Sequence, residues 1–395
     1  MKKYIKSERA NLFEPNVYIS MIASIEGRVT CEDISSAVKE AYQKNEATLS
    51  KIVLEDTGEA YYKKMQSTGC KVFFDTRDWE EIIQDNERKS FAINEGELVR
   101  TFVICGDSGY QLLIMAHHLV GDGKSVLILL QDILDALAGN ELVYKPMELL
   151  DEETLFKKTK LPLGVSWWID KVNARWRRTG KVFAWDDYYA VHKSYWEKHS
   201  SKIEVKTYSA ETLKRECNGK ATLNSFLVAK LLEEYPKAKV IGVPISIREE
   251  TRTMANLTSG IAIKYQYDSS QSFDKNLVTI HSKLQEKLKN IKSKYFVLMF
   301  VAKLCPSLVD AVLLEAHDCY QNNFTKKMAK IMGYTGSYTR ELGVTNLMKI
   351  DIASNYDSFQ IKDVLFIPPK VSYSKNVVGI CTYQDKLQIC YHKVV

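Results

Sequence analysis

Several common active-site patterns are missing from this sequence of 395 residues. Its eight cysteines form no Cys-x-x-Cys pair, so neither a zinc ribbon nor a thioredoxin-type redox motif is indicated. Cys105 and Cys390 stand alone within apolar segments, and we expect both to be small buried side chains of a protein in a reducing cytoplasm. The Gly-x-Ser-x-Gly turn that presents a catalytic serine is also absent, which removes one common route of covalent catalysis.

Long uninterrupted apolar runs and a strong charge of one sign are also missing. Residues 1–15 are polar where a secretory signal needs an apolar core. The longest apolar region, residues 295–316, is interrupted by Lys303, Pro306 and Asp310, so we expect a kinked pair of core helices and no transmembrane segment. A net charge of +6, with acidic residues interspersed, is too small to indicate a nucleic-acid ligand. It suits an anionic small molecule or an acidic protein partner.

What is present is the composition of a globular chain that is long enough for two domains, with 45% hydrophobic residues. Apolar strand patterns alternate with amphipathic helix patterns in both halves, which predicts a mixed α/β fold. We expect one domain over 1–160, a crossover linker over 161–200 and a second domain over 201–395. Local signals include Thr30 and Ser272 as helix caps, and hairpin turns at 56–58, 106–109 and 384–385.

Residues 145–200, around the crossover, have a composition of their own. Two interpretations remain open. In the first, the aromatic side chains of this segment pack on both halves of the protein while its basic side chains stay in water. In the second, the basic side chains form a surface for a phosphorylated cofactor, an acidic carrier protein or a membrane. Five of the six tryptophans and a group of bases lie here: Trp167, Trp168, Trp176, Trp185, Trp196, Lys157, Lys158, Lys160, Lys171, Arg175, Arg177 and Arg178.

The stretch LLIMAHHLVGDGKSVLILL, residues 112–130, places two histidines and a glycine-rich turn between a strand pattern and a helix pattern. HLVGDGKS differs from the phosphate loop GxxxxGK[ST] only at its first position, His118. A metal site would use His117, His118 and Asp122, although neighbouring strand residues face opposite ways. A third interpretation is a buried histidine pair that only satisfies hydrogen bonds.

General-base catalysis fits this geometry better. Strand alternation lets His118 emerge at the strand end into a cleft, whereas His117 lies on the other face as a supporting residue. An imidazole titrates near neutral pH and can take a proton from a hydroxyl, an amine or a thiol. Asp122 can fix the loop by pairing with a distant arginine, and the flanking glycines allow a tight backbone and close approach of a ligand.

HHLVGDG resembles the HHxxxDG signature of the chloramphenicol acetyltransferase-like superfamily, which includes condensation domains and alcohol acetyltransferases. The resemblance extends over GELVRTFVI and the helix DGKSVLILLQDILDALAG in the first half. In the second half it covers ATLNSFLVAKLL, VIGVPISIRE and LGVTNLMKID. It implies two similar domains, each a mixed sheet flanked by helices, with an active-site channel between them.

The resemblance also implies roles for single residues. His118 would deprotonate a hydroxyl or amine acceptor, which attacks the thioester of coenzyme A or of a phosphopantetheine arm on a carrier protein. No covalent enzyme intermediate and no permanently bound cofactor are implied. Asp122 would be structural, with Arg248 as its first-choice partner and Arg100 as its second. Candidates that would stabilise the oxyanion are the amide of Gly123 and the side chains of Thr345 and Asn346.

The sequence departs from the family pattern in two ways. It lacks the Asp-Phe-Gly-Trp-Gly sequence of the plant enzymes, and it is shorter than a typical condensation domain. We therefore expect a freestanding acyltransferase of bacterial style. Two alternatives remain: a catalytically inactive binding protein on the same fold, and a nucleotide-binding protein that uses the GDGKS turn.

Overall fold

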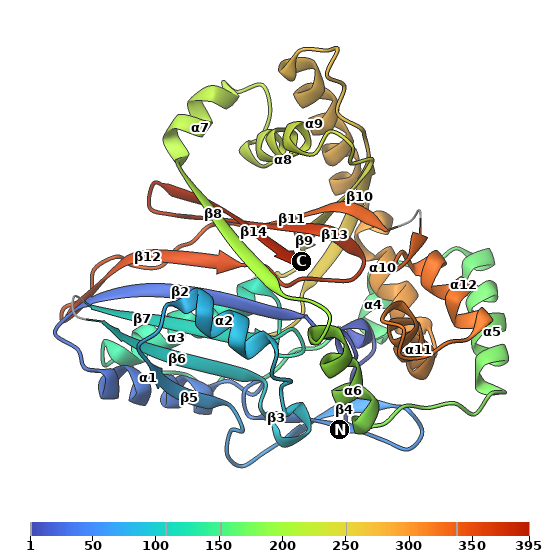
Figure 1. The fold of residues 1–395 in the computed structure, drawn as a ribbon, viewed down its shortest axis with the longest axis horizontal. Coiled ribbons are helices and arrows are strands. Elements are labelled where there is room, and N and C mark those ends of the chain that lie inside the picture. Colours follow the sequence, from blue (N-terminus) through green and yellow to red (C-terminus); the bar gives the residue numbers. More distant parts are fainter. Residues whose placement is uncertain (1, 107–108, 151, 250, 337–338, 395) are drawn as a thin grey trace.

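The computed structural model describes residues 2–106, 109–150, 152–249, 251–336 and 339–394. Two large sheets lie one above the other, and helices cover the outer side of each (Figure 1). The lower sheet has five strands and the upper sheet six, and each contains both parallel and antiparallel pairs. The expected mixed α/β fold with two sheets flanked by helices is therefore confirmed.

The five-stranded sheet carries the histidine motif on its middle strand. In order across the sheet, its strands are β12 (Phe359–Ile367), β2 (Tyr18–Gly27), β7 (Gly109–His117), β6 (Val99–Gly106) and β5 (Lys71–Asp75). β7 is apolar on both faces because it is the central strand, as its sequence pattern predicts. β6 and β7 pair in antiparallel fashion up to Gly106 and Gly109, while the expected turn residues 107 and 108 lie outside the described residues.

Helices α1 (Cys31–Lys44) and α3 (Gly123–Leu137) pack against each other and cover one face of this sheet (Figure 1). α1 begins at the expected cap, where the Thr30 side chain accepts from the amide of Asp33 and the Asp33 carboxylate accepts from the amide of Thr30. Helix α2 (Trp79–Glu87) contacts strand β8 (Ser201–Ser209) of the other sheet. The two sheets are thus joined by packing as well as by the chain.

Strand β12 belongs to the second half of the sequence but lies in the sheet of the first half. It pairs with β2 from the Phe359–Gly27 pair to the Ile367–Ser20 pair. The domain limits predicted from the sequence (1–160, 161–200 and 201–395) do not allow for this exchange. Its pattern is that of an ordinary strand, and nothing local indicates which sheet the strand joins.

The six-stranded sheet forms most of the second half. Helices α7 (Ala210–Cys217), α8 (Leu223–Glu234) and α9 (Phe273–Lys289) share a hydrophobic core with it. The expected Ser272 cap of α9 and the hairpin turn at 384–385 are confirmed. In order, the strands are β10 (Thr258–Lys264), β9 (Val240–Ser246), β11 (Arg340–Lys349), β13 (Ser374–Tyr383), β14 (Lys386–Val394) and β8 (Ser201–Ser209).

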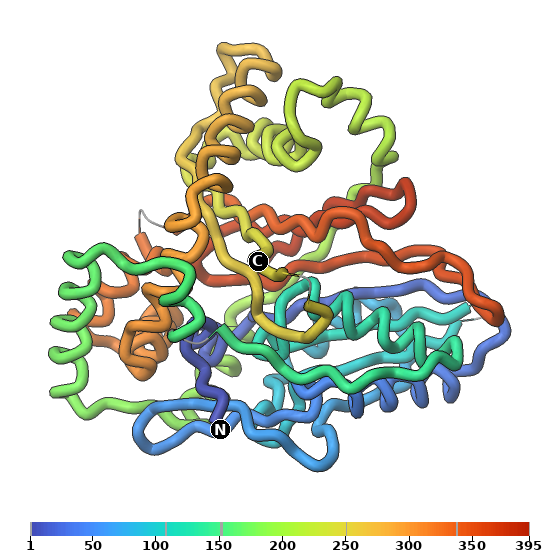
Figure 2. The backbone as a smooth tube through the Cα atoms, turned by 180° about the vertical axis from the view of Figure 1, so that it is seen from behind, coloured from blue at the N-terminus to red at the C-terminus, as the bar shows by residue number. Residues whose placement is uncertain are grey.

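The apolar region 295–316 forms the expected kinked pair of helices, α10 (Ile291–Lys303) and α11 (Pro306–Ala316), which are bent by 100°. Within the described residues, no single helix meets the length and hydropathy needed to cross a membrane; this bent pair meets them only as a unit. α11 is a core helix, whereas α10 exposes Ile291, Phe296 and Val297. Both lie with α12 (Asn323–Met332) on one side of the molecule, as Figure 2 shows from behind.

The N-terminal segment is held beside these helices. Its short strand β1 (Lys3–Tyr4) joins β4 (Ala60–Lys64) and β3 (Ser50–Leu54), which form the expected hairpin around 56–58. A turn of 3₁₀ helix, η1 (Arg9–Asn11), follows. The buried Arg9 guanidinium donates from Nε to Asp310 Oδ1 of α11 at 2.8 Å. A second short 3₁₀ turn, η2 (Ile93–Glu95), lies elsewhere in the chain, just before β6.

The crossover contains helices α4 (Glu152–Lys158), α5 (Leu163–Arg177) and α6 (Trp185–Trp196). Trp176 is buried, stacks on Phe324 and donates to Ser307, and Trp196 donates to the Pro15 carbonyl. All the bases named in the sequence are exposed. Trp176 and Trp196 therefore pack on the two halves as the first interpretation expects, whereas the Trp167 side chain is 63% exposed, and the exposed bases are compatible with both interpretations.

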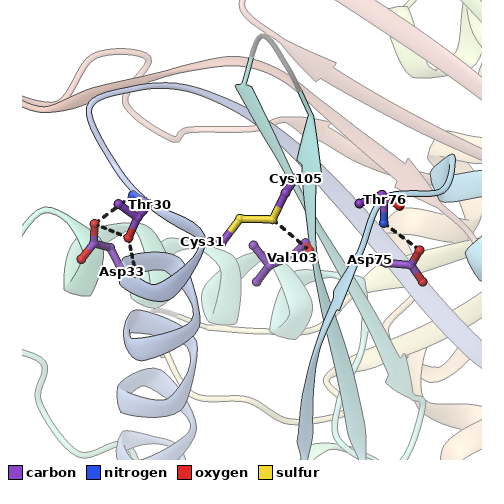
Figure 3. Close-up of a disulfide and its surroundings, with 7 residues drawn as sticks. All are labelled: Thr30, Cys31, Asp33, Asp75, Thr76, Val103 and Cys105. Carbon is purple, nitrogen blue, oxygen red and sulfur yellow. Dashed lines mark hydrogen bonds between the residues drawn. A yellow bond between two sulfur atoms is a disulfide. The ribbon is translucent and has the colours of Figure 1, made fainter.

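The cysteine prediction holds for Cys390, which is buried, but is wrong for Cys105. Cys105, at the end of β6, forms a disulfide with Cys31 at the start of α1, and their Cα atoms lie 6.6 Å apart (Figure 3). The two cysteines are 74 residues apart in the sequence. Only the packing of α1 on the sheet brings them together, so their spacing gives no local signal.

Candidate active site

His118 lies one residue beyond the end of β7 and lines the main cavity of the described structure, which has a volume of about 970 Å³. Its amide donates to the Val17 carbonyl at 3.0 Å, which fixes the backbone where it leaves the strand. The cavity wall combines η1, the turn after His118, α5 and α10 with strands β9, β10 and β11. The predicted base therefore faces a cavity that both halves of the chain build.

The His118 ring is oriented by Asn256, which lies in the loop before β10. His118 Nδ1 is 2.8 Å from Asn256 Oδ1. The Asn256 amide nitrogen donates to the His118 carbonyl at 2.6 Å and also to Glu8. Because that nitrogen is engaged elsewhere, the amide oxygen faces the ring, and an amide oxygen can only accept a hydrogen bond.

A buried carboxyl group, Glu8, lies behind Asn256. The Glu8 Oε1 atom contacts the Tyr62 hydroxyl at 2.7 Å, and the same hydroxyl contacts the Leu119 carbonyl at 2.7 Å. Burial raises the pKa of Glu8 to about 7. Burial also lowers the pKa of His118, so this imidazole is neutral at neutral pH.

His117 is buried on the opposite side of the strand end, as alternation predicts. Its ring packs edge-on against Tyr18 and Phe91, and its Nδ1 accepts from the amide of Leu119 at 3.2 Å. Burial lowers the pKa of His117 to about 3. His117 therefore supports the turn as a neutral side chain, and it and His118 are turned to different neighbours, which excludes a metal ion shared by both.

Asp122 is paired with Arg248, as expected. Arg248 Nη2 donates to Asp122 Oδ1 at 3.0 Å, and the two side chains are only 7% and 3% exposed. The other carboxylate oxygen accepts from the amide of Leu257 and the hydroxyl of Thr258. Asp122 also caps α3 by accepting from the amide of Ser125 at 2.9 Å. One carboxylate thus closes the histidine turn and joins it to the second half.

The second-choice partner, Arg100, is wrong. Its guanidinium is committed elsewhere, to the Glu97 carboxylate, to the backbone carbonyls of residues 86, 89 and 90, and to the face of Phe91. Arg100 is a buried structural residue of β6. The family resemblance ranked Arg248 first, but the strand pattern alone does not exclude Arg100, because both arginines follow or lie in strands.

The three oxyanion candidates all line the cavity but differ in availability. Gly123 is the first residue of α3, where backbone amides point towards incoming negative charge. A Cβ atom there would lie 2.8 Å from the end of the Leu347 side chain, which would have to shift. The Asn346 amide is occupied by Asn224 and by the backbone of Met348. Gly123 and Thr345 are therefore the stronger candidates.

The phosphate-loop interpretation is contradicted by the same contacts. The Ser125 hydroxyl, which a phosphate loop needs for its magnesium ion, is fully buried and bound to Asp122, Ala255 and Arg248. The carboxylate of Asp122 already occupies the start of α3, where a phosphate group would bind. The GDGKS turn is a capped helix start.

Sequence reasoning missed Glu8, Tyr62 and Asn256. They come from three segments far apart in the chain, and none belongs to a local motif. Glu8 stands in a polar N-terminal stretch that reads as solvent-exposed. The only available signal was Asn256, which lies in an uncharged stretch between Arg252 and a strand.

Comparison with known proteins supports the fold. No protein-family model matches the chain. Bacitracin synthase 2 of Bacillus licheniformis is 29% identical over 158 residues, which is 38% of this chain and 6% of that much longer protein. Polyketide synthase associated protein 5 from Mycobacterium tuberculosis has a structure with a TM-score of 0.61 and 12% identity, covering 100% of this chain and 92% of its own.

Condensation domains match equally well. The first condensation domain of the CDA synthetase has a TM-score of 0.64 and 11% identity, over 100% of this chain and 90% of that domain. A variant of the starter condensation domain of rhizomide synthetase, solved in complex with C8-CoA, has a TM-score of 0.60 and 11% identity, over 100% and 89%. The chain therefore has the two-lobed condensation-domain fold, in which mixed sheets face each other across the site.

Proposed function

We propose that the protein is an acyltransferase that moves an acyl group from a thioester to a hydroxyl or amine acceptor, with His118 as the general base. The observation that carries this proposal is the His118 imidazole itself. It lines the cavity between the two lobes, burial lowers its pKa, and its Nδ1 atom lies 2.8 Å from the amide oxygen of Asn256. Nε2 is thereby left with a free lone pair for an acceptor proton.

The proposed reaction needs no covalent bond to the protein. The acceptor oxygen or nitrogen attacks the thioester carbonyl carbon while His118 Nε2 takes the acceptor proton. The tetrahedral intermediate then collapses, the carbon–sulfur bond breaks, and the proton passes from His118 to the thiolate. The products are an ester or amide and a free thiol, and the imidazole returns to its neutral state.

The start of α3 would stabilise the oxyanion of that intermediate. The amide of Gly123 belongs to the first turn of the helix and lines the same cavity as His118. The Thr345 hydroxyl comes from β11 on the opposite lobe. A well-placed donor of this kind contributes about 2 to 4 kcal/mol of transition-state stabilisation. Both residues already line the cavity, so the proposal requires no backbone movement.

The thioester donor would be an acyl-coenzyme A or an acyl group on a carrier protein. A coenzyme A thioester occupies one of the condensation domains that share this fold, which supports the first choice. Much of the cavity wall on α10 and α12 is apolar, which suits an acyl chain. The exposed bases of the crossover would suit the phosphates of coenzyme A or an acidic carrier.

The test is an acyl-transfer assay that measures the release of free thiol from a panel of acyl-coenzyme A donors, with alcohols and amines as acceptors. His118→Ala should lower the rate by about 10²- to 10⁴-fold, because that is the usual contribution of a general base. His199→Ala, which changes a half-buried histidine outside the cavity, is the matched control and should retain the wild-type rate.

Undiminished transfer by His118→Ala would overturn the catalytic assignment. A wild-type protein that binds acyl-coenzyme A in a calorimeter but releases no thiol with any acceptor would instead support the inactive binding protein. Carrier-bound donors should be included in the panel, so that a preference for a carrier protein is not mistaken for inactivity.

A further inference from the structure

A chain of polar contacts runs from His118 along the cavity wall, which Asn256 and Glu8 also line, and ends at the buried Tyr62. It passes through Asn256 to Glu8 and from there to Tyr62 and the Leu119 carbonyl. Glu8 is 7% exposed and Tyr62 is 5% exposed. These residues come from the N-terminal segment, β4 and the loop before β10, so the fold has brought three separate segments together behind one imidazole.

The number of hydrogens at Asn256 fixes its orientation. Its amide nitrogen has two hydrogens, and the two acceptors beside it are the His118 carbonyl and the Glu8 carboxyl group. Turning the amide over would place its oxygen against both acceptors. Glu8 therefore holds Asn256 with its oxygen towards His118 Nδ1.

The number of hydrogens at Tyr62 fixes the charge of Glu8. The Tyr62 hydroxyl has one hydrogen but lies 2.7 Å from two acceptor oxygens, Glu8 Oε1 and the Leu119 carbonyl. The Leu119 carbonyl can only accept, so it takes the hydrogen of Tyr62. The contact between Glu8 and Tyr62 is then satisfied when Glu8 itself is the donor, which requires the protonated acid.

We infer that Glu8 and Asn256 are positioning residues for His118, and that Glu8, as a neutral acid, holds Asn256 so that His118 keeps its proton on Nδ1. This inference rests on the proposed role of His118 as the base. It means that Nε2, the nitrogen without a protein partner, carries the lone pair. The ring also makes a hydrogen bond to the backbone of His118 itself, and Asn256 is the side chain that adds to it.

The charges around Glu8 agree with the neutral form. The groups that face it are Tyr62 on β4, Asn256 before β10 and the carboxylate of Asp122 at the start of α3. No cation pairs with Glu8 among the described residues, since Arg248 is used by Asp122. Burial is the largest effect on the pKa of Glu8, and the negative charge of Asp122 raises that pKa further.

The tautomer can be measured without substrate, by the ¹⁵N chemical shifts of the histidine ring nitrogens. The chain has seven histidines, and the signals of His118 are those lost in His118→Ala. The wild type should show a protonated Nδ1 and an unprotonated Nε2 for His118. Asn256→Ala and Glu8→Leu should both move the proton towards Nε2, the first by removing the acceptor and the second by freeing the amide to turn.

Two further variants serve as controls. Glu8→Gln keeps a neutral side chain that can donate to Tyr62 and accept from Asn256, so it should keep the wild-type tautomer. Asn11→Ala removes another side-chain amide that lines the cavity but is not hydrogen-bonded to His118, and it should also keep the wild-type tautomer of His118. If Glu8→Leu does not fold, Asn256→Ala and Glu8→Gln still carry the test.

A wild-type His118 with its proton on Nε2, or an unchanged tautomer in Asn256→Ala, would overturn the inference. In the transfer assay, Asn256→Ala should lower kcat by about tenfold or more with a nearly unchanged KM; a change in KM alone would contradict a positioning role. If the tautomers are as expected but no thiol is released, the proposed function fails and the assigned tautomer stands. If transfer depends on His118 but the tautomer is reversed, the inference fails and the function stands.

Discussion

Burial pushes several ionisable side chains around the histidine turn to their neutral forms. It lowers the pKa of His117 to about 3, lowers the pKa of His118 and raises the pKa of Glu8 to about 7. The Asp122–Arg248 pair remains charged beside them. A neutral imidazole base needs this environment, because a charged carboxylate next to it would favour the imidazolium form.

The raised pKa of Glu8 predicts a stability that falls as the pH rises. The ordinary carboxyl pKa is 4.5 and the value in the folded protein is about 7, so between these values the folded state holds a proton that the unfolded state has released. The contribution of the Glu8 proton to the free energy of unfolding is fully present below pH 4.5 and is lost as the pH rises through 7. The difference of about 2.5 pKa units corresponds to about 3 kcal/mol.

Glu8→Gln replaces this group with one that stays neutral. We expect the variant to match the wild type in urea denaturation at pH 5 and to be more stable by up to about 3 kcal/mol at pH 8.5. Glu95→Gln, which changes an exposed carboxylate on the 3₁₀ turn η2, is the control and should change the stability equally at the two pH values. A Glu8→Gln variant that is no more stable than the wild type at pH 8.5 would show that the folded protein does not disfavour the charged form of Glu8.

At this scale, the sequence predicts what lies within one turn of the chain. The alternation of β7 separates His117 from His118, and the loop spacing identifies Asp122. The family resemblance added Arg248. Glu8 and Asn256 were out of reach, because 110 and 138 residues separate them from His118 and neither forms a pattern with its own neighbours.

Among the secondary-structure elements, the start of α3 does the most to shape the site. Asp122 caps the helix, binds Arg248 and accepts from the backbone of Leu257. The Ser125 hydroxyl makes hydrogen bonds to the Asp122 carboxylate, the Ala255 carbonyl and the Arg248 guanidinium. The turn that carries His118 is therefore fixed both by contacts with helix α3, which follows it, and by contacts with residues of the second half.

Asp122→Asn should lower both stability and rate. The carboxamide of the variant has one acceptor oxygen fewer than the carboxylate and leaves the buried charge of Arg248 without a counter-ion. This should lower the free energy of unfolding by about 3 to 5 kcal/mol. Thermal unfolding of the variant and its thiol-release rate check this. Asp85→Asn breaks a surface pair with Lys89 and should cost less than about 1 kcal/mol. A slower Asp122→Asn enzyme with unchanged melting would contradict the structural role.

Elements with local signals were predicted well. Thr30 and Ser272 cap the helices that they precede, and Pro306 marks the break between α10 and α11. Cys31–Cys105 was missed because a disulfide depends on which helix packs against which strand, and the chain spacing of 74 residues does not contain that information.

Across the whole molecule, the two halves are built from each other's segments. β12 completes the sheet of the first half, and Arg9 of the first half is buried against Asp310 of the second. The predicted domain boundaries assumed that each sheet uses consecutive strands, and the exchange of β12 breaks that assumption.

We therefore predict that the halves cannot fold separately. A fragment of residues 1–198 lacks β12, so the edge of β2 is left unpaired along a ladder that runs from Gly27 to Ser20. An exposed apolar edge strand of this length favours aggregation. The fragment alone should be insoluble or lack a cooperative thermal transition, and co-expression with residues 199–395 should restore a soluble complex in a pull-down.

A nicked full-length protein separates the loss of β12 from the loss of the peptide bond. A protease site placed at the exposed Lys198 cuts the chain between α6 and β8 after folding. The two pieces should stay together in size-exclusion chromatography and separate only in denaturant, because the β12–β2 ladder and the Arg9–Asp310 pair still join them. A fragment of residues 1–198 that is monomeric and melts cooperatively would show that β12 is dispensable to the first sheet.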